Sequence, residues 1–119
     1  MTIDLSRIRI FVRPGVTDMR KQINGLSSIV EEAMFLDPLD GSLFLFMGRD
    51  RRKIKALYWD RNGFCLWQKR LERDRFPWPR DSSDPLDYLR EINRTELEQL
   101  LSGIDFWNAH RPIIFSRSG

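Results

Sequence analysis

An Asn-Gly pair at Asn62 and Gly63 separates two strand-like segments, and this feature most narrows the folds that are open to the chain. The preceding segment reads IKALYWD and the following one reads FCLWQKRL. A type I′ turn needs positive φ at both central residues, which makes Asn-Gly between two such segments a strong signal for a hairpin. The sequence therefore predicts an antiparallel hairpin with Asn62 and Gly63 in its turn.

The predicted register pairs Tyr58 with Trp67 and Lys55 with Arg70. Because side chains alternate between the two faces of a sheet, one face, which we expect to be the core face, carries Ile54, Ala56, Tyr58, Cys65, Trp67 and Leu71. The other face carries Leu57, Trp59, Phe64 and Leu66, with Lys55, Arg61 and Arg70 among them. Like charges directly opposite each other destabilise a strand pair. The pairing of Lys55 with Arg70 therefore implies either open solvent or a bound anion.

A strand and a helix are predicted before the hairpin. Residues 7–12 alternate charged and apolar side chains as a half-buried strand does, and Pro14-Gly15 ends them. Thr17 or Asp18 can cap a helix over residues 19–35, in which apolar side chains recur at spacings of three and four. The apolar run LFLFM, residues 43–47, predicts a central strand that completes a three-stranded antiparallel meander with the hairpin.

The C-terminal part changes character. Residues 81–94 are acidic and polar, which predicts a linker, and Thr95 with Glu98 fits a capping box that starts a helix over residues 95–105. Gly103 suits the end of that helix. Residues 106–119 form a tail without a recognisable pattern. A chain of 119 residues can build one core. We therefore expect a small single domain of the α/β (α+β) class, with a strand, a helix and the meander in residues 1–80.

Composition excludes several classes of function. No window approaches the apolar length of a membrane span, and the N-terminus lacks the apolar region of a signal peptide, so we expect a cytoplasmic protein. Cys65 and His110 are each single, which leaves no disulfide, metal cluster or partnered nucleophile. Asp37, Asp40, Asp50 and Asp60 could in principle form a two-metal nuclease site, but they stand where turns favour aspartate. We expect no catalytic residue, cofactor, metal or small-molecule substrate.

Charge is distributed unevenly along the chain. Residues 49–75 carry ten Lys and Arg against four Asp and Glu, whereas residues 80–105 carry three Arg against seven acids. A basic segment of this kind favours an anionic partner, nucleic acid above all, although a solvated surface is the alternative. The candidate DNA-binding residues are Arg49, Arg51, Arg52, Lys53, Lys55, Lys69, Arg70, Arg73 and Arg75. Aromatic side chains in the same segment could stack on bases, but Tyr58, Phe64 and Trp67 are more typical of a small sheet's core.

Several motifs also resemble one family. They are DMRKQINGL at 18–26, DPLDGSLFLF at 37–46, KALYWDRNGFCLWQKRLE at 55–72, FPWP at 76–79 and TELEQLLSGID at 95–105. In this order they are similar to the small accessory TnpB proteins, encoded by the second reading frame, of the insertion-sequence-66 family of bacterial transposable elements. The resemblance spans roughly residues 7–105. It implies a role in transposition beside a separate transposase, with no established catalytic activity.

Two functions remain open from the sequence. The first is a non-catalytic accessory factor that binds element ends or target DNA through residues 49–75, and that would be associated with the bacterial nucleoid. The second is an interaction module that assembles with the transposase or other element-encoded proteins without touching DNA. The acidic residues 80–105, with their leucines, and the aromatic tail are the basis of this second hypothesis.

Overall fold

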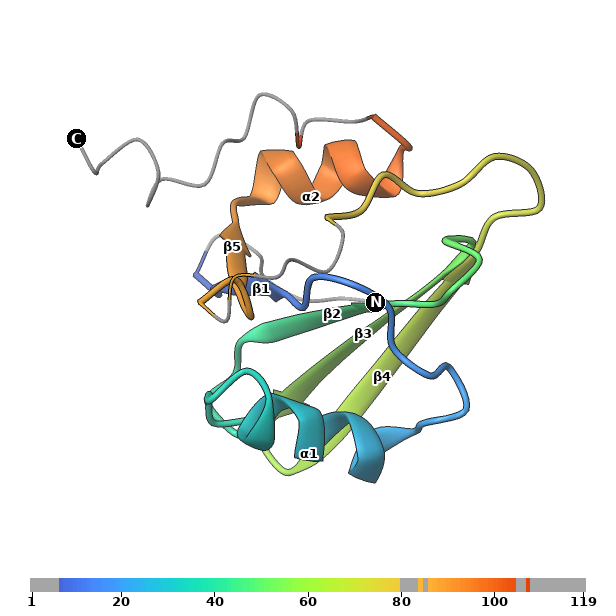
Figure 1. The fold of residues 1–119 in the computed structure, drawn as a ribbon. Helices are drawn as coiled ribbons and strands as arrows, with labels where there is room; N and C mark the ends of the chain where they lie inside the picture. Colours follow the sequence, from blue (N-terminus) through green and yellow to red (C-terminus); the bar gives the residue numbers. More distant parts are fainter. Residues whose placement is uncertain (1–6, 80–83, 85, 105–106, 108–119) are drawn as a thin grey trace.

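The computed structural model describes residues 7–79, 84, 86–104 and 107, and within them five strands form one mixed sheet (Figure 1). The strand order is β4-β3-β2-β1-β5. In chain order the elements are β1 (Ile10–Val12), α1 (Ile23–Glu32), β2 (Leu43–Met47), β3 (Lys53–Asp60), β4 (Gly63–Arg70), β5 (Arg90–Ile92) and α2 (Arg94–Leu101). β1 pairs in parallel with β2, and the other neighbouring strands are antiparallel. The predicted α+β class and the meander of β2, β3 and β4 are confirmed.

Helices cover both faces of the sheet, with α1 on one side and α2 on the other (Figure 1). Leu26 and Val30 of α1 pack with Phe44, Phe46 and Leu57 in one cluster. On the opposite face, the second cluster gathers buried side chains from α2, from all strands except β4, and from the segment after β4: Ile10, Val12, Leu43, Leu45, Met47, Ile54, Ala56, Phe76, Trp78, Ile92, Leu97 and Leu100. The continuous apolar run of β2 is explained by this double cover, since both of its faces are buried.

The FPWP motif, residues 76–79, packs against the α2 face of the sheet. Phe76 and Trp78 are 1% and 6% exposed. The indole Nε1 of Trp78 donates to the carbonyl oxygens of Arg13 at 3.1 Å and Gly15 at 2.9 Å, and the amide of Gly15 donates to the carbonyl of Pro79 at 2.8 Å. Hydrogen bonds therefore hold the segment after β4 against the segment after β1.

The hairpin register differs from the prediction by two residues. Asp60 lies opposite Gly63 and Tyr58 lies opposite Cys65, so the turn consists of Arg61 and Asn62 rather than Asn62 and Gly63. Arg61 has the positive φ, 52°. A slip of two residues keeps every side chain on its own face. The predicted composition of the two faces is therefore correct, but the expectation of a single core face is wrong, because both faces are covered.

This register also corrects the predicted pair of like charges. Lys53, not Lys55, lies opposite Arg70, and Lys55 lies opposite Gln68. Lys53 is half-buried and Arg70 is exposed, and Arg70 Nε lies 2.9 Å from a carboxylate oxygen of Glu72. The repulsion expected between two cations is thus reduced by a nearby carboxylate and by solvent.

Both helices start at other residues than predicted. α1 begins at Ile23, because residues 18–21 form a turn in which Asp18 Oδ1 accepts from the amide of Arg20 and the carbonyl of Asp18 accepts from the amide of Lys21. α2 begins at Arg94, with the capping box at Asn93 and Glu96. Asparagine is at least as good an N-cap as threonine, which explains the earlier start.

A fifth strand lies within the predicted linker. β5 pairs with β1, and Glu91 accepts two hydrogen bonds from the guanidinium of Arg9, at 2.9 and 2.8 Å. Such a short strand leaves almost no periodicity in the sequence, so only its distant partner reveals it. Residues 81–83 and 85 of that linker lie outside the described residues, as does the tail from residue 106 except for Trp107.

Candidate nucleic-acid interface

Two chain segments with unusually many cations meet at one end of the sheet. The turn between β2 and β3 lies beside the segment that follows β4 (Figure 1). The amide of Leu71 donates to the carbonyl of Arg52, and the amide of Phe76 donates to the carbonyl of Arg51, both at 2.7 Å. We call this region the cationic end; it carries Arg49, Arg51, Arg52, Lys53, Lys69, Arg70, Arg73 and Arg75. Eight of the nine predicted DNA-binding residues are thereby brought together.

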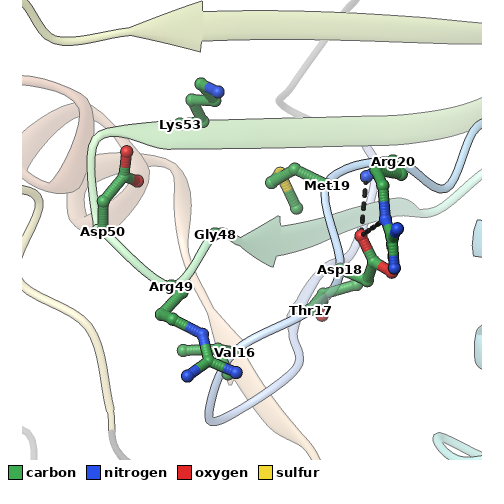
Figure 2. A pocket seen from close by; sticks show the side chains of 9 residues that line it. All are labelled: Val16, Thr17, Asp18, Met19, Arg20, Gly48, Arg49, Asp50 and Lys53. Atoms are coloured by element: carbon green, nitrogen blue, oxygen red, sulfur yellow. Dashed lines mark hydrogen bonds and ion pairs between the residues drawn. The ribbon is translucent and has the colours of Figure 1, made fainter.

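One hollow of about 530 Å³ opens on the α1 side of the cationic end (Figure 2). Residues 16–20 form one wall and residues 48–50 with Lys53 form the other. Glycine at position 48 leaves room for Met19, because a Cβ there would lie 2.7 Å from Met19 Cγ and would force that side chain to move. Figure 2 shows Asp18 and Arg20 held to each other, while the guanidinium of Arg49 extends toward Val16.

A second hollow, of about 730 Å³, opens on the α2 side. Four cations line it, Arg52, Lys69, Arg73 and Arg75, together with Asp74 and the residues that end α2. Lys69 Nζ donates to the carbonyl oxygen of Leu101 at 3.1 Å, which places a cation against the negative end of the α2 dipole. The sequence predicted an interface formed by one continuous segment, residues 49–75. Residues 16–20 and 101–103 also line the hollows, and no pattern in their sequence indicates this.

Most cations of this end have no anionic partner in the described part of the chain. Arg70 pairs with Glu72. Six side chains take part in no ion pair or hydrogen bond within the described residues: those of Arg49, Arg51, Arg52, Lys53, Arg73 and Arg75. The carboxylate of Asp50, which lies between Arg49 and Arg51 in the sequence, accepts from the backbone amide of Arg52 at 3.0 Å instead. This end therefore has spare positive charge for an anionic ligand.

Arg51 has an unusual backbone conformation. Its φ is 59°, in the left-handed region that glycine and asparagine occupy more readily. Backbone strain of this kind costs of order 1 kcal/mol and tends to persist at functional positions. An arginine here is thus not the residue that stability alone would favour.

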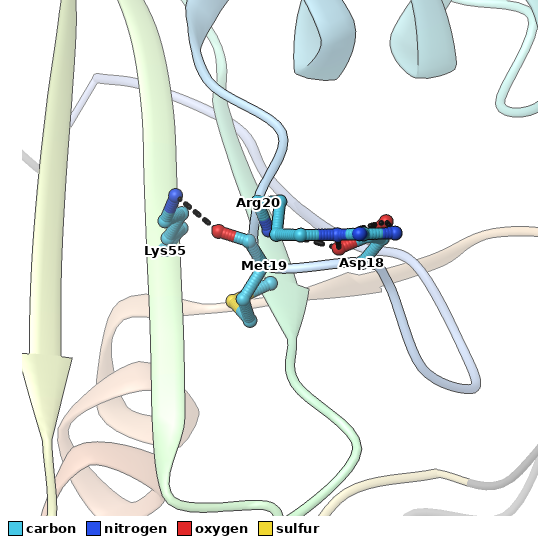
Figure 3. Close-up of polar contacts among 4 residues, drawn as sticks. All are labelled: Asp18, Met19, Arg20 and Lys55. Atoms are coloured by element: carbon cyan, nitrogen blue, oxygen red, sulfur yellow. Dashed lines mark hydrogen bonds and ion pairs between the residues drawn. The ribbon is translucent and has the colours of Figure 1, made fainter.

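Lys55 does not belong to this surface. It is 2% exposed, and its Nζ donates to the carbonyl oxygens of Met19 at 2.9 Å and Lys21 at 2.8 Å (Figure 3). Burial, reinforced by the charge of Lys53, lowers the pKa of its ammonium below the ordinary 10.5. The prediction that Lys55 contacts DNA is not compatible with this position, and we exclude it from the candidate interface.

Three of the four aromatic side chains of the hairpin pack against the core, and the fourth, Trp59, lies edge-to-face on Phe64. Tyr58 and Trp67 pack against the cluster on the α2 face and Phe64 packs against the one on the α1 face. The Cys65 thiol lies opposite Tyr58, where burial and a hydrogen bond to Cys65 raise the phenol's pKa. Among the described residues no three His, Cys, Asp or Glu side chains group as metal ligands do. His110 lies outside the described residues.

The acids of residues 80–105 are largely used inside the fold. Asp87 pairs with Arg90, Glu91 with Arg9 and Glu98 with Arg94, and Glu96 belongs to the capping box of α2. Leu97 and Leu100 are buried in the core. Two of the leucines are thus unavailable to a partner, whereas Leu86 is 71% exposed and the paired carboxylates of Glu91 and Glu98 stay accessible at the surface. The hypothesis of an interaction module based on residues 80–105 therefore stays open.

Comparison with known families agrees with the motifs. The family model described as "IS66 Orf2 like protein" (TnpB) matches residues 8–111. The chain belongs to the IS66 Orf2-like family. This makes it an insertion-sequence-associated protein. No solved structure matches it.

Two curated relatives extend this family assignment without adding a function. Uncharacterized protein y4hO of Sinorhizobium fredii is 40% identical over 99 residues, covering 83% of this chain and 83% of the relative. Uncharacterized protein y4jC of the same organism is 31% identical over 104 residues, covering 87% and 86%. Among the described residues of this IS66 Orf2-like protein, no helix has the length and apolar content needed to span a membrane.

Proposed function

We propose that this IS66 Orf2-like protein is a non-catalytic accessory factor of DNA transposition that binds the DNA backbone through its cationic end. The observation that supports the proposal most is the convergence of residues 49–53 and 69–75 at one end of the sheet, with six cations that have no anionic partner among the described residues. Lys and Arg side chains neutralise phosphates and release the counterions condensed on DNA, which provides affinity without sequence preference.

The two hollows suit a ligand that extends along the surface. Arg49 and Lys53 line the hollow on the α1 side, and Arg52 lines the one on the α2 side. The three residues belong to one turn and the strand that follows it, so positive charge runs from one face of the sheet to the other around its end. A phosphate backbone, with charge repeated along its length, matches that distribution better than a compact anion does.

The proposal is tested by removing charge without shortening side chains. In the triple variant Arg49→Gln, Arg52→Gln, Arg75→Gln, the affinity for a labelled DNA duplex should fall similarly for unrelated sequences, measured by fluorescence anisotropy. The slope of log affinity against log salt should become shallower by roughly 2 to 3, at about 0.9 for each lost phosphate contact. Stability should change little, because Arg49 and Arg75 are exposed and Arg52 is only half-buried without a side-chain partner, and substitutions of such charges usually cost within about 0.5 kcal/mol each.

A matched control removes the same charge elsewhere. Arg7, Arg61 and Arg94 lie outside the cationic end and are exposed. Their triple replacement by Gln should leave the affinity and the salt slope near the wild-type values. If both triple variants lose DNA affinity equally, the effect is one of net charge alone. If the cationic-end variant keeps the wild-type affinity, this interface is excluded. Assembly with the transposase without DNA, the other hypothesis, would be favoured by co-purification of the two proteins that survives nuclease treatment.

A further inference from the structure

The segment that follows α1 lies on the other side of the molecule from the turn between β2 and β3 (Figure 1), and its Phe35 forms an exposed aromatic pair with Tyr88. Phe35 is 69% exposed and Tyr88 is 39% exposed, and their ring centroids lie 5.2 Å apart at an interplanar angle of 89°. Leu39 and Leu86, which are 52% and 71% exposed, stand close to them in the sequence. We call Phe35 and Tyr88 the aromatic patch.

Phe35 is an unfavourable residue for its backbone position. Its φ is 58°, and the amide of the next residue, Leu36, donates to the carbonyl of Val30 to close the end of the helix. Helices that end with a left-handed residue usually place glycine or asparagine there. A large, exposed aromatic ring at this position contributes little to the core and is typical of a binding surface.

Carboxylates surround the chain on both sides of Phe35. Glu31 and Glu32 occupy the last turn of α1, where the helix dipole makes acidic side chains unfavourable. Asp37 and Asp40 follow in the next turn. None of these four forms an ion pair within the described residues, although Asp37 and Asp40 each accept a backbone hydrogen bond, from the amides of Leu39 and Ser42. Arg9, which interacts electrostatically with Asp40, is already paired with Glu91.

We propose that the aromatic patch and the carboxylates of residues 31–40 dock a cationic amphipathic segment of a second protein. The aromatic rings offer anchors for apolar side chains, and the carboxylates are complementary to Lys and Arg beside those side chains. A second copy of this chain is the weaker match, because its unpaired cations lie in the turns and at the strand ends of the cationic end and not along an amphipathic segment. The proposal does not depend on DNA binding.

The test uses two short fluorescent peptides, one an amphipathic helix of Leu and Lys and the other the same peptide with Glu in place of Lys. The full chain should bind the cationic peptide with an affinity that weakens with salt, and it should not bind the anionic one. Phe35→Gly should reduce the affinity for the cationic peptide about tenfold, as loss of an interface anchor does. The melting temperature should stay the same or rise, because glycine relieves the strain at φ 58°.

Two further variants separate docking from general stickiness. Glu31→Gln with Glu32→Gln should weaken binding of the cationic peptide and flatten its salt dependence, without loss of thermal stability. Ile104→Ser removes an exposed apolar side chain elsewhere and should leave binding unchanged. The proposal is overturned if the wild-type protein does not bind the cationic peptide, or if Phe35→Gly binds it equally well. It is also overturned if sedimentation shows self-association that Phe35→Gly abolishes, since the patch would then be an interface between copies.

Discussion

The ammonium of Lys55 lies 2.9 Å from the carbonyl oxygen of Met19 and so fastens β3 to the segment before α1 (Figure 3). The same Nζ donates to the carbonyl of Lys21 at 2.8 Å. In a helix that began at residue 19, these carbonyls would accept from backbone amides four residues later. Lys55 is thus absent from the candidate interface, and its ammonium occupies carbonyl oxygens that a longer α1 would have used in its own hydrogen bonds.

Replacing Lys55 by Met should therefore act on stability rather than on DNA binding. The variant keeps the aliphatic volume but leaves two partly buried carbonyls without their donor, at an expected cost of about 1 to 3 kcal/mol in the free energy of unfolding. Urea denaturation measures that cost. A Lys55→Met protein that is as stable as the wild type but has lost DNA affinity would show that Lys55 reaches the ligand.

The hairpin turn offers a test of the corrected register. Gly63 has no positive φ, and a Cβ added to it would meet no neighbouring atom within 4 Å, whereas Arg61 has φ 52°. Gly63→Ala should therefore leave the stability unchanged or slightly higher, and Arg61→Gly should not destabilise the fold. If Gly63 occupied a type I′ turn, Gly63→Ala would instead cost about 1 kcal/mol or more.

Trp78 and Trp67 should differ in their contributions to stability. Trp78 is nearly buried and its indole makes two hydrogen bonds, whereas Trp67 is half-buried on the edge strand β4. We expect Trp78→Ala to cost about 3 to 5 kcal/mol and Trp67→Ala to cost less, of order 2 kcal/mol. Denaturation of both variants gives the ranking, and the reverse order would contradict the assigned packing.

The carboxyl of Asp18, in the turn before α1, should become protonated only at unusually low pH. Hydrogen bonds from Arg20 hold the pKa of the Asp18 carboxyl at about 2, below its ordinary 3.8. A carboxyl whose pKa is lowered by folding stabilises the fold above its unfolded pKa, and that stabilisation is lost as the pH falls from about 4 to about 2. In Arg20→Gln, NMR titration should show the pKa of Asp18 raised part of the way toward 3.8, since the backbone hydrogen bond remains. An unchanged pKa would contradict the ion pair.

Patterns in the sequence predicted those structural features that depend on residues close together in the chain. The faces of the hairpin followed from alternation, but alternation is the same after a slip of two residues, so it could not choose between Lys53 and Lys55 as the residue opposite Arg70. The capping box of α2 was predicted at Thr95 and lies at Asn93, because two overlapping caps fit the same stretch. β5 and the burial of Lys55 depend on partners more than 30 residues away, which no local pattern reports.

The candidate site was predictable in composition and not in shape. The run of cations in residues 49–75 identified eight members of the cationic end. Its two hollows are also lined by residues 16–20 and 101–103, which are distant in the sequence and come close to the cations only in the folded protein. The aromatic patch was not predicted at all, because Phe35 reads as part of the helix until its backbone conformation is known.

The salt dependence of DNA binding by the wild-type protein tests the central claim most directly. If six or so phosphates are contacted, log affinity for a duplex should fall with log salt at a slope of about −5, from roughly −0.9 per phosphate. Anisotropy titrations at several salt concentrations give that slope. Absence of binding at about 50 mM salt, or an affinity that does not change with salt, would contradict the account.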